Sequence, residues 1–223
     1  MTRILYDLAA ADPDLRFSPY CWRIKLALTH KNLDYETVAW RFTEKDAIAF
    51  SGQTKVPVLV DGDKTVFDSY AIAEYLESAY PNEPVLFNDT GTRALTRFVK
   101  QWTEDTLHPA IARLILPSLF VQMDPKDQPY IRKTREAMFG MTLEEMAARH
   151  DEFLPTFKAV LVPLRRTLQA QPFLAGPTPL FADHIVFGAL QWARKGSAVP
   201  LWDLDDPIER WMEAVLDTYG IES

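Results

Sequence analysis

The sequence predicts two domains of different class: an α/β domain at residues 1–80 and an all-helical domain at residues 92–223, joined by a linker at residues 81–91. In the first part, short apolar runs alternate with segments of helical periodicity. From residue 92 onward only the helical spacing of apolar residues recurs. Between the two parts, the segment Tyr80-Pro81-Asn82-Glu83-Pro84 combines prolines with polar residues, which is typical of a connection.

The first domain is predicted to follow the order β-α-β-α-β-β-α. Its clearest signal is Asp61-Gly62-Asp63, because an Asp-Gly between two apolar runs is typical of a hairpin. A β-α-β start followed by a hairpin gives a mixed four-stranded sheet with helices packed on it. Strands are expected at residues 4–6, 34–40, 56–60 and 64–67, and helices from residue 19, at 43–50 and at 69–80.

The second domain is predicted to be a bundle of about five helices. Its first helix is expected to be long, with His108-Pro109 as a kink, because proline interrupts the helical hydrogen-bond ladder. Further helices are expected at residues 130–149, 153–170, 182–195 and 206–219.

Composition argues against several classes of function. The chain has 223 residues, 48% of them hydrophobic, and a net charge of −7 that is spread over both domains. Because there is no basic tail or stripe, we expect no nucleic acid partner. No apolar run reaches the roughly 18–20 residues that a membrane span needs. The first residues also lack the apolar core of a signal peptide, so no membrane association is expected.

The chain has one cysteine, Cys21, so no disulfide can form within it and a cytoplasmic location is the default expectation. The four histidines, His30, His108, His150 and His184, show no metal-ligand spacing among themselves or with Cys21, and no metal is expected. The glycines form no phosphate-binding loop.

The segment from Phe17 to Arg23 is predicted to place a serine hydroxyl at the start of a helix. Ser18 fits the N-cap position, where its oxygen accepts an otherwise unpaired helix N–H, and Pro19 fits the first helical position. The partial positive charge of a helix N-terminus stabilises an anion placed there. Ser18 can therefore donate its hydroxyl proton to a bound thiolate, although an ordinary helix start would explain the same residues.

Two further segments carry a similar pair of interpretations. Val56-Pro57 begins a strand. Proline is tolerated at a strand start and can simply mark where the strand begins. Alternatively, it forms a cis peptide in a tight turn that exposes the backbone of Val56. Asp68-Ser69 is a helix cap that could also hold an ammonium group and a carboxylate.

Together these segments resemble the glutathione transferase family over essentially the whole chain. Ser18-Pro19-Tyr20-Cys21 is similar to the C-P-Y-C site of glutaredoxins with the first cysteine replaced by serine, and Val56-Pro57 matches the cis-proline loop of the family. The run from Asp68 to Leu76 matches its (E/D)-S-x-A-I-x-x-Y-L pattern, and residues 173–176 with Ala182-Asp183 resemble its F-L-x-G…A-D segment. The resemblance implies a thioredoxin-like N-terminal domain followed by an all-α C-terminal domain.

One position departs from the family pattern. The family often has Ser or Thr three residues before the residue equivalent to Asp183, whereas this chain has Leu180. The side-chain capping bond at that helix start is therefore not expected from Leu180.

The resemblance implies that glutathione is the co-substrate and that Ser18 lowers the pKa of its thiol. It assigns the γ-glutamyl end to Asp68-Ser69, while Gln53 and Lys55, by position, are candidates for the glycine carboxylate or for solvated loop side chains. The glutathione-binding candidates are Ser18, Gln53, Lys55, Val56, Pro57, Asp68 and Ser69. A homodimer with Asp68-Ser69 close to its interface is also implied.

The segment S-P-Y-x-W-R is similar to that of bacterial serine-type transferases related to β-etherases. This resemblance implies that the glutathione thiolate attacks a small hydrophobic electrophile, and aryl ether cleavage is one such reaction. A glutathione-dependent isomerase or dehalogenase and a non-catalytic binding module remain alternatives. The second substrate is expected between the domains, against the long helix. The candidate lining residues are Phe17, Trp102, Glu104, Asp105, His108 and Arg113.

Tyr6 and Cys21 are alternatives to Ser18 as the group that activates the thiol. Tyr6 ends the first predicted strand, but the intervening residues 9–17 place Ser18 at the start of the helix. Cys21 falls on the first helical turn, where a thiol pKa can be lowered. It also falls on the apolar face with Ile24 and Leu28, which favours a buried, inert thiol.

Overall fold

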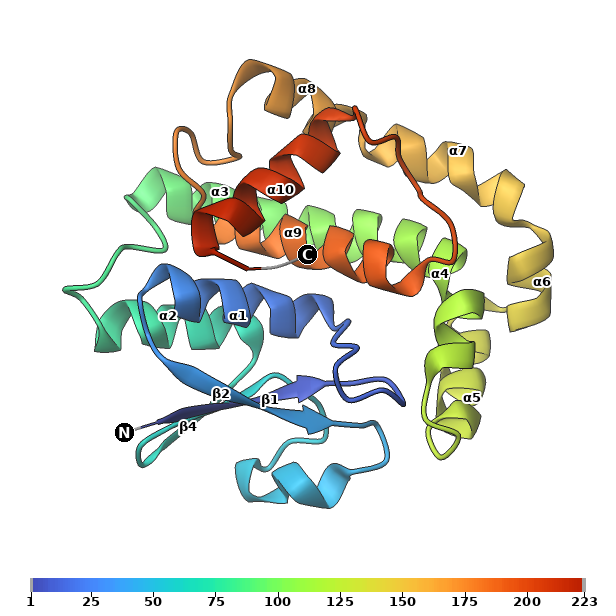
Figure 1. The fold of residues 1–223 in the computed structure, drawn as a ribbon, viewed down its shortest axis with the longest axis horizontal. Coiled ribbons are helices and arrows are strands. Elements are labelled where there is room, and N and C mark those ends of the chain that lie inside the picture. Colours follow the sequence, from blue (N-terminus) through green and yellow to red (C-terminus); the bar gives the residue numbers. More distant parts are fainter. Residues whose placement is uncertain (1, 222–223) are drawn as a thin grey trace.

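The computed structural model describes residues 2–221 as a sheet-containing domain beside a larger set of helices (Figure 1). The four strands are β1 (Arg3–Leu8), β2 (Tyr35–Trp40), β3 (Val58–Asp61) and β4 (Lys64–Phe67). They form one sheet in the order β2-β1-β3-β4, with β1 parallel to β2 and the other neighbours antiparallel. The predicted mixed four-stranded sheet is therefore confirmed.

The helices of this domain cover both faces of the sheet. Helices α1 (Pro19–His30) and α2 (Ser69–Ala79) lie between the sheet and the helical domain, whereas the helix η1 (Lys45–Ser51) lies on the opposite face (Figure 1). The predicted helix at 43–50 is the short 3₁₀ helix η1. The arrangement is thioredoxin-like, as the resemblance implied.

The chain continues as helices from Thr90 to Tyr219, in the predicted all-α class. The long first helix consists of α3 (Thr90–Trp102), a π-helical turn η2 (Thr103–Leu107) and α4 (His108–Gln122). Pro109 has no N–H to donate to the carbonyl of Asp105, which interrupts the hydrogen-bond ladder at this turn. The irregularity thus lies just before the predicted kink at His108-Pro109.

The expected number of about five helices is wrong. The predicted helix at 130–149 is divided into α5 (Gln128–Phe139) and α6 (Leu143–Ala148), because Gly140 adopts a left-handed conformation with φ of 66° and ends α5. The predicted helix at 153–170 is α7 (His150–Val160) and α8 (Val162–Ala170), and Pro163 stands in the first turn of α8. The last two helices, α9 (Phe181–Gly196) and α10 (Pro207–Tyr219), lie close to their predicted bounds.

One hydrophobic core runs through both domains. Helix α1 packs along α9, and the rings of Trp22 and Phe187 meet there with centroids 5.9 Å apart. Gly188 on α9 faces the start of α1 so closely that an added Cβ would collide with the carbonyl oxygen of Pro19. A residue without a side chain is therefore required where the helical domain contacts the first turn of α1.

A polar junction joins α1, α9 and α10 further along. The Nε2 of His30 lies 2.9 Å from the Val85 carbonyl, and its Nδ1 lies 2.9 Å from the Tyr219 hydroxyl. Because a carbonyl only accepts, neutral His30 donates from Nε2 and accepts at Nδ1 from Tyr219. The Tyr219 oxygen then accepts from the Nε2 of His184 at 2.7 Å. Burial lowers the pKa of both histidines, which keeps them neutral.

The start of α9 is capped without a side-chain bond from Leu180, as expected. The Asp183 carboxylate accepts the backbone N–H of Leu180 at 3.1 Å and of Leu174 at 2.8 Å, and the indole N–H of Trp211 at 3.2 Å. Burial raises the pKa of Asp183 to about 6. This carboxylate ties the loop before α9 to α10.

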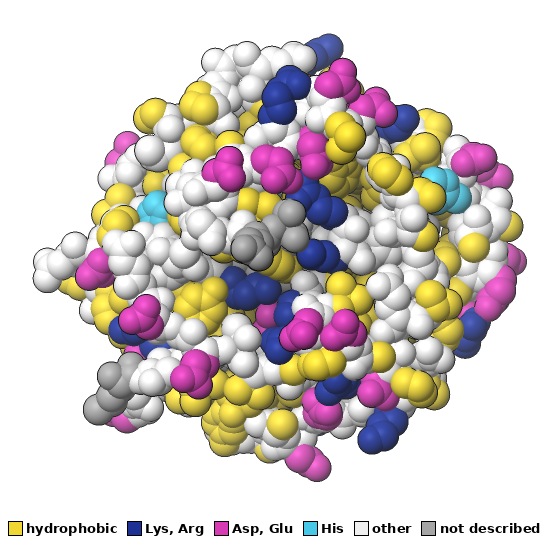
Figure 2. Space-filling view, in the orientation of Figure 1, with side chains coloured by type: hydrophobic (Ala, Val, Ile, Leu, Met, Phe, Trp, Pro, Cys, Tyr) yellow, Lys and Arg dark blue, Asp and Glu magenta, His cyan; other side chains and the backbone are white. Residues whose placement is uncertain are grey.

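Acidic and basic side chains are interspersed on the face shown in Figure 2 and form no patch of one sign there. Among the helices of the described chain, none is long and apolar enough to cross a membrane. The described residues also contain no group of three or more His, Cys, Asp or Glu side chains arranged to hold a metal ion.

Candidate active site

Ser18 lies at the N-cap of α1, as predicted. Its Oγ accepts the backbone N–H of Cys21 at 3.2 Å, and Pro19 occupies the first turn. Because the oxygen accepts this bond, the hydroxyl proton remains available for another partner. Ser18 is 3% exposed and lines a cavity, so a group bound there would lie in the field of the helix N-terminus and largely away from water.

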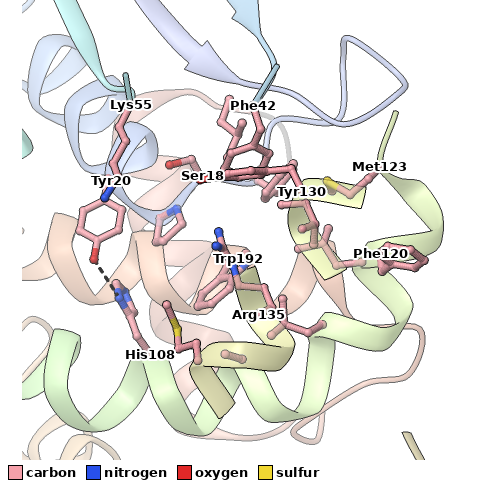
Figure 3. A pocket seen from close by; sticks show the side chains of 18 of the residues that line it. Ser18, Tyr20, Phe42, Lys55, His108, Phe120, Met123, Tyr130, Arg135 and Trp192 are labelled. Carbon is pink, nitrogen blue, oxygen red and sulfur yellow. Dashed lines mark hydrogen bonds between the residues drawn. The ribbon is translucent and has the colours of Figure 1, made fainter. Parts of the chain in front are cut away.

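The cavity has a volume of about 660 Å³ and lies between the two domains. In Figure 3 Ser18, Phe42 and Lys55 lie toward the strands, whereas His108 and Arg135 lie toward the helices of the second domain. We call these two sides the thiol wall and the acceptor wall. The thiol wall is formed by residues 17–20, 40, 42 and 54–56 with Leu8, and the acceptor wall by residues of α4 and α5 with Glu104, Met123 and Trp192.

The glutathione-binding candidates fall into two groups. Ser18, Lys55 and Val56 line the cavity, whereas Gln53, Pro57, Asp68 and Ser69 do not. Gln53 is half-buried in the loop that carries Lys55, and the peptide bond between Val56 and Pro57 is cis, as predicted.

Asp68 caps α2, as the sequence suggested, and Ser69 is the first residue of that helix. The Asp68 Oδ1 accepts the backbone N–H of Tyr70 at 2.9 Å and of Ala71 at 3.0 Å. Asp68 has a φ of 66°, which is uncommon for a residue with a side chain, and such conformations gather at ligand-binding positions. Ser69 is buried and contacts Arg23.

Arg23 was missed by the sequence analysis as a site residue. Its guanidinium is fully buried, with Nη1 2.7 Å from the Glu104 carboxylate and 3.4 Å from the Ser69 hydroxyl. Its Nε and Nη2 are buried without a hydrogen-bond partner among the described residues. Glu104 comes from the π-helical turn η2 and also binds Lys100 at 2.7 Å. A buried cation with two donors unused is suited to an additional anion beside Ser69.

The expected second-substrate residues are only partly brought together. Phe17, Glu104, His108 and Arg113 line the cavity, whereas Trp102 packs against the main core and Asp105 is exposed, and neither lines it. The aromatic residues that dominate the acceptor wall were not predicted, because they come from helices far apart in the sequence. The missed lining residues include Phe42, Phe120, Tyr130, Arg135 and Trp192.

His108 lies beside Tyr20 within the cavity. The Tyr20 hydroxyl is 3.5 Å from the His108 Nδ1 (Figure 3). The Tyr20 ring also lies under the Arg23 guanidinium, whose carbon is 4.6 Å from the ring centre. Burial and the charge of Arg23 lower the pKa of His108 to about 3, and burial raises the pKa of Tyr20. Both side chains are therefore uncharged at neutral pH.

Tyr6 and Cys21, the two alternatives for thiol activation, do not line the cavity. Tyr6 packs against Phe50 with ring centroids 5.5 Å apart. Cys21 is fully buried, and burial raises the pKa of its thiol well above its usual value, as expected for an inert buried thiol.

Comparison with known proteins identifies the class of protein that this fold and site define. Residues 94–217 match the C-terminal domain of the glutathione S-transferase family, and residues 13–84 match its N-terminal domain. The chain therefore belongs to the glutathione S-transferase family.

Individual relatives are distant. A "Probable glutathione S-transferase" of Glycine max is 26% identical over 139 residues, which is 59% of this chain and 60% of the relative. Glutathione S-transferase U1 of Arabidopsis thaliana is 31% identical over 61% of this chain and 59% of its own length. The chain thus spans less than two thirds of the length of these curated relatives.

The likeness to solved structures extends over the whole chain. Glutathione transferase GSTFuA3 from Phanerochaete chrysosporium is 26% identical with a TM-score of 0.87, covering 100% of this chain and 99% of that one. CsGST83044 of Ceriporiopsis subvermispora, solved in complex with glutathione, is 22% identical with a TM-score of 0.86, covering 99% and 98%. The predicted fold class is confirmed.

Proposed function

We propose that this protein is a glutathione transferase that activates the thiol of glutathione at Ser18 and joins glutathione, through its sulfur, to a hydrophobic electrophile. The observation that carries the proposal is the buried Ser18 hydroxyl, which caps α1 and faces a cavity between the domains. Its proton is free to donate to a thiolate, and the helix N-terminus stabilises the same negative charge. Both effects lower the pKa of the thiol and increase the thiolate fraction near neutral pH.

The surrounding residues support a position for the rest of the glutathione molecule. The Ser69 hydroxyl, with the buried charge of Arg23 behind it, would bind the γ-glutamyl carboxylate, and the Asp68 carboxylate would bind its ammonium group. At the other end, Lys55 or Gln53 would bind the glycine carboxylate. Glu104 would hold the Arg23 guanidinium in place through their ion pair.

The proposed reaction is a nucleophilic substitution. The thiol releases its proton to solvent, the thiolate forms a bond to the electrophilic carbon, and the leaving group departs with the electron pair of the broken bond. Holding both reactants in one cavity supplies much of the rate. Because the Ser18 segment is similar to β-etherases, we include aryl ethers, from which a phenolate would leave. We further propose that the protein is a homodimer, which light scattering would test, and that it is cytoplasmic.

The test is an ultraviolet titration of the thiolate band of glutathione with wild type, Ser18→Ala and Ser18→Thr. We expect the band in wild type and in Ser18→Thr, which keeps the hydroxyl, and its loss in Ser18→Ala. Because a hydrogen bond to a charged group contributes about 1.5–3 kcal/mol, kcat/KM for an electrophile should fall about 10- to 100-fold in Ser18→Ala.

The matched control is Ser78→Ala, which removes an exposed hydroxyl on α2 that bonds only backbone carbonyls. Urea unfolding of each variant shows whether a lost band results from a destabilised fold or from the missing Ser18 hydroxyl. A band that persists in Ser18→Ala would assign activation to another group, with Tyr6 and Cys21 to be tested next. Absence of the band in wild type at saturating glutathione would favour a non-catalytic binding protein.

A further inference from the structure

The acceptor wall contains two arginines whose charge is not neutralised. Arg113 on α4 and Arg135 on α5 both line the cavity, and within residues 2–221 neither guanidinium lies within ion-pair distance of a carboxylate. The other charged group on this wall, Glu104, is paired with Arg23 and Lys100. In a chain of net charge −7, the uncompensated charge of this wall is therefore positive.

The described contacts of Arg135 are with uncharged groups, namely Phe42, Thr134 and Tyr130. Its guanidinium carbon lies 5.6 Å from the centre of the Phe42 ring, and its Nη1 donates to the hydroxyl of the adjacent Thr134 at 3.0 Å. Burial lowers the pKa of Arg135, and the nearby Tyr130 hydroxyl opposes this effect only in part. Arg113 is partly satisfied, because it donates to the Pro109 carbonyl at 3.1 Å and stacks on Phe139 at 5.1 Å.

The aromatic rings around the two arginines, including Phe42 of the thiol wall, select a flat, apolar body for the bound molecule. Phe42 and Tyr130 lie with ring centroids 5.6 Å apart, and the Trp192 and His108 rings also lie with centroids 5.6 Å apart. Aromatic side chains favour planar ring systems by stacking, and pockets of this kind use a few placed polar groups to fix orientation. His108 stays uncharged, so the arginines are the groups that discriminate by charge.

We propose that the acceptor substrate is an aromatic compound that carries a carboxylate, and that Arg135 binds this carboxylate while the rings of Phe42, Tyr130 and Trp192 hold its aromatic part. The planar guanidinium pairs with a carboxylate through two parallel hydrogen bonds, which a neutral group cannot reproduce. Arg113 adds to the positive field of the wall. This inference rests on the proposed function for its chemistry, but the binding preference is a property of the acceptor wall alone.

The experiment measures binding without turnover. Quenching of tryptophan fluorescence, to which Trp40 and Trp192 in the cavity contribute, gives the affinities of para-nitrobenzoate and of its neutral counterpart para-nitrobenzamide. We expect wild type to prefer the carboxylate by about tenfold or more, since a charge-assisted pair contributes about 1.5–3 kcal/mol. The preference should decrease as salt is added.

Variants assign the preference to a residue. Arg135→Met should abolish it, Arg135→Lys should keep part of it, and Lys133→Met should leave it unchanged, because exposed Lys133 lies on the same helix outside the cavity. Equal wild-type affinities for the two ligands, or an unchanged preference in Arg135→Met, would overturn the inference. If Arg135→Met fails to fold, the Arg135→Lys variant and the salt titration decide the same question.

The two proposals fail separately. Ser18→Ala should retain the preference for para-nitrobenzoate, because the acceptor wall is intact. If the thiolate band is absent but the preference is present, the proposed catalysis is wrong and the anion-binding wall remains. If the band is present but the preference is absent, the transferase acts on neutral acceptors. With turnover, a chloronitrobenzoate should then have no advantage in kcat/KM over its chloronitrobenzamide.

Discussion

Both walls carry aromatic rings, but the thiol wall adds the Ser18 hydroxyl and backbone groups at a helix start and a loop, whereas the acceptor wall adds two arginines, from α4 and α5. The first wall obtains its polarity from local backbone geometry, such as the cap at Ser18. The second obtains its shape from the packing of helices that are distant in the sequence. The proposed thiol-activating site can therefore be predicted from a short segment, whereas the proposed acceptor site depends on the tertiary structure.

The largest effect is expected where Glu104 of the acceptor wall pairs with the buried Arg23 of α1. Replacing Glu104 with Gln removes the carboxylate 2.7 Å from the buried Arg23 guanidinium. Breaking a buried pair typically destabilises a protein by about 3–5 kcal/mol, and we expect the lower end because the Glu104 side chain is 19% exposed. Urea unfolding measures this loss, and the KM for glutathione should increase as Arg23 loses its position.

Lys100→Met is the matched control for this prediction. It removes the other ion pair of Glu104, which is more accessible to solvent, and should cost less than about 1 kcal/mol. If Glu104→Gln costs no more stability than Lys100→Met, the buried pair between Glu104 and Arg23 does not hold α1 to the acceptor wall.

The next effect concerns the contact between α9 and the first turn of α1. Gly188→Ala should destabilise the protein by about 2 kcal/mol, since its Cβ would press on the Pro19 carbonyl, and overpacking typically costs 1–3 kcal/mol. The shift would also move Ser18, so the thiolate band of glutathione should weaken. Gly196→Ala provides the comparison, because its Cβ would meet the side chain of Ile115, with the movable Cδ1 nearest at 2.8 Å, and no backbone atom among its nearest contacts. Equal stability of the two variants would contradict the close approach.

Acidification should weaken the fold while leaving the charge of the acceptor wall unchanged. The pKa values of His30, His108 and His184 are lowered by burial, so these residues take up protons in the unfolded chain near pH 6.5 before they do so in the folded one. Stability is full above this pH and decreases as the pH falls below it. Asp183 acts in the opposite direction, because its raised pKa of about 6 lets the folded state take up a proton first.

The three histidines lower the free energy of unfolding more than the one carboxylate raises it, so we expect a net loss of about 1–2 kcal/mol in this free energy between pH 7 and pH 6. Urea unfolding at the two pH values measures this loss, and para-nitrobenzoate binding should change little over the same interval. His30→Gln should reduce the pH dependence of unfolding. A fold that gains stability on acidification to pH 6 would contradict the assignment of neutral histidines.

The smallest effect is expected from the hydrogen bond between Tyr20 and His108. At 3.5 Å it is long, so Tyr20→Phe should cost less than about 1 kcal/mol in unfolding and change acceptor affinity by less than about threefold. Tyr70→Phe is the matched control, since the buried Tyr70 hydroxyl has no partner within residues 2–221 and its loss should be neutral or stabilising. A large effect of Tyr20→Phe would show that His108 needs this bond to shape the acceptor wall.

The parts that could be predicted from the sequence are those that a few neighbouring residues determine. Ser18 and Pro19 start α1 because hydroxyl caps and N1 prolines are local signals, and the Asp-Gly hairpin follows from its turn chemistry. The cis peptide before Pro57 was also anticipated. The roles proposed for Ser18, Asp68 and Ser69 in binding glutathione remain predictions.

The parts that escaped prediction depend on contacts between distant segments. Arg23 and Glu104 are separated by 81 positions, and nothing near either residue indicates the other. The same holds for Tyr130 and Trp192, which meet the cavity from α5 and α9. Helix number was underestimated, because periodicity continues across Gly140 while its backbone conformation does not.

The close approach of Gly188 to Pro19 has a consequence for recombining domains among relatives. A chimera that joins residues 1–80 of this chain to the helical part of another transferase would place a foreign α9 against the first turn of α1. Any side chain larger than hydrogen at the position of Gly188 would press on the carbonyl one residue after Ser18. A foreign helical domain is therefore compatible with this N-terminal domain only if its α9 has glycine at the position of Gly188.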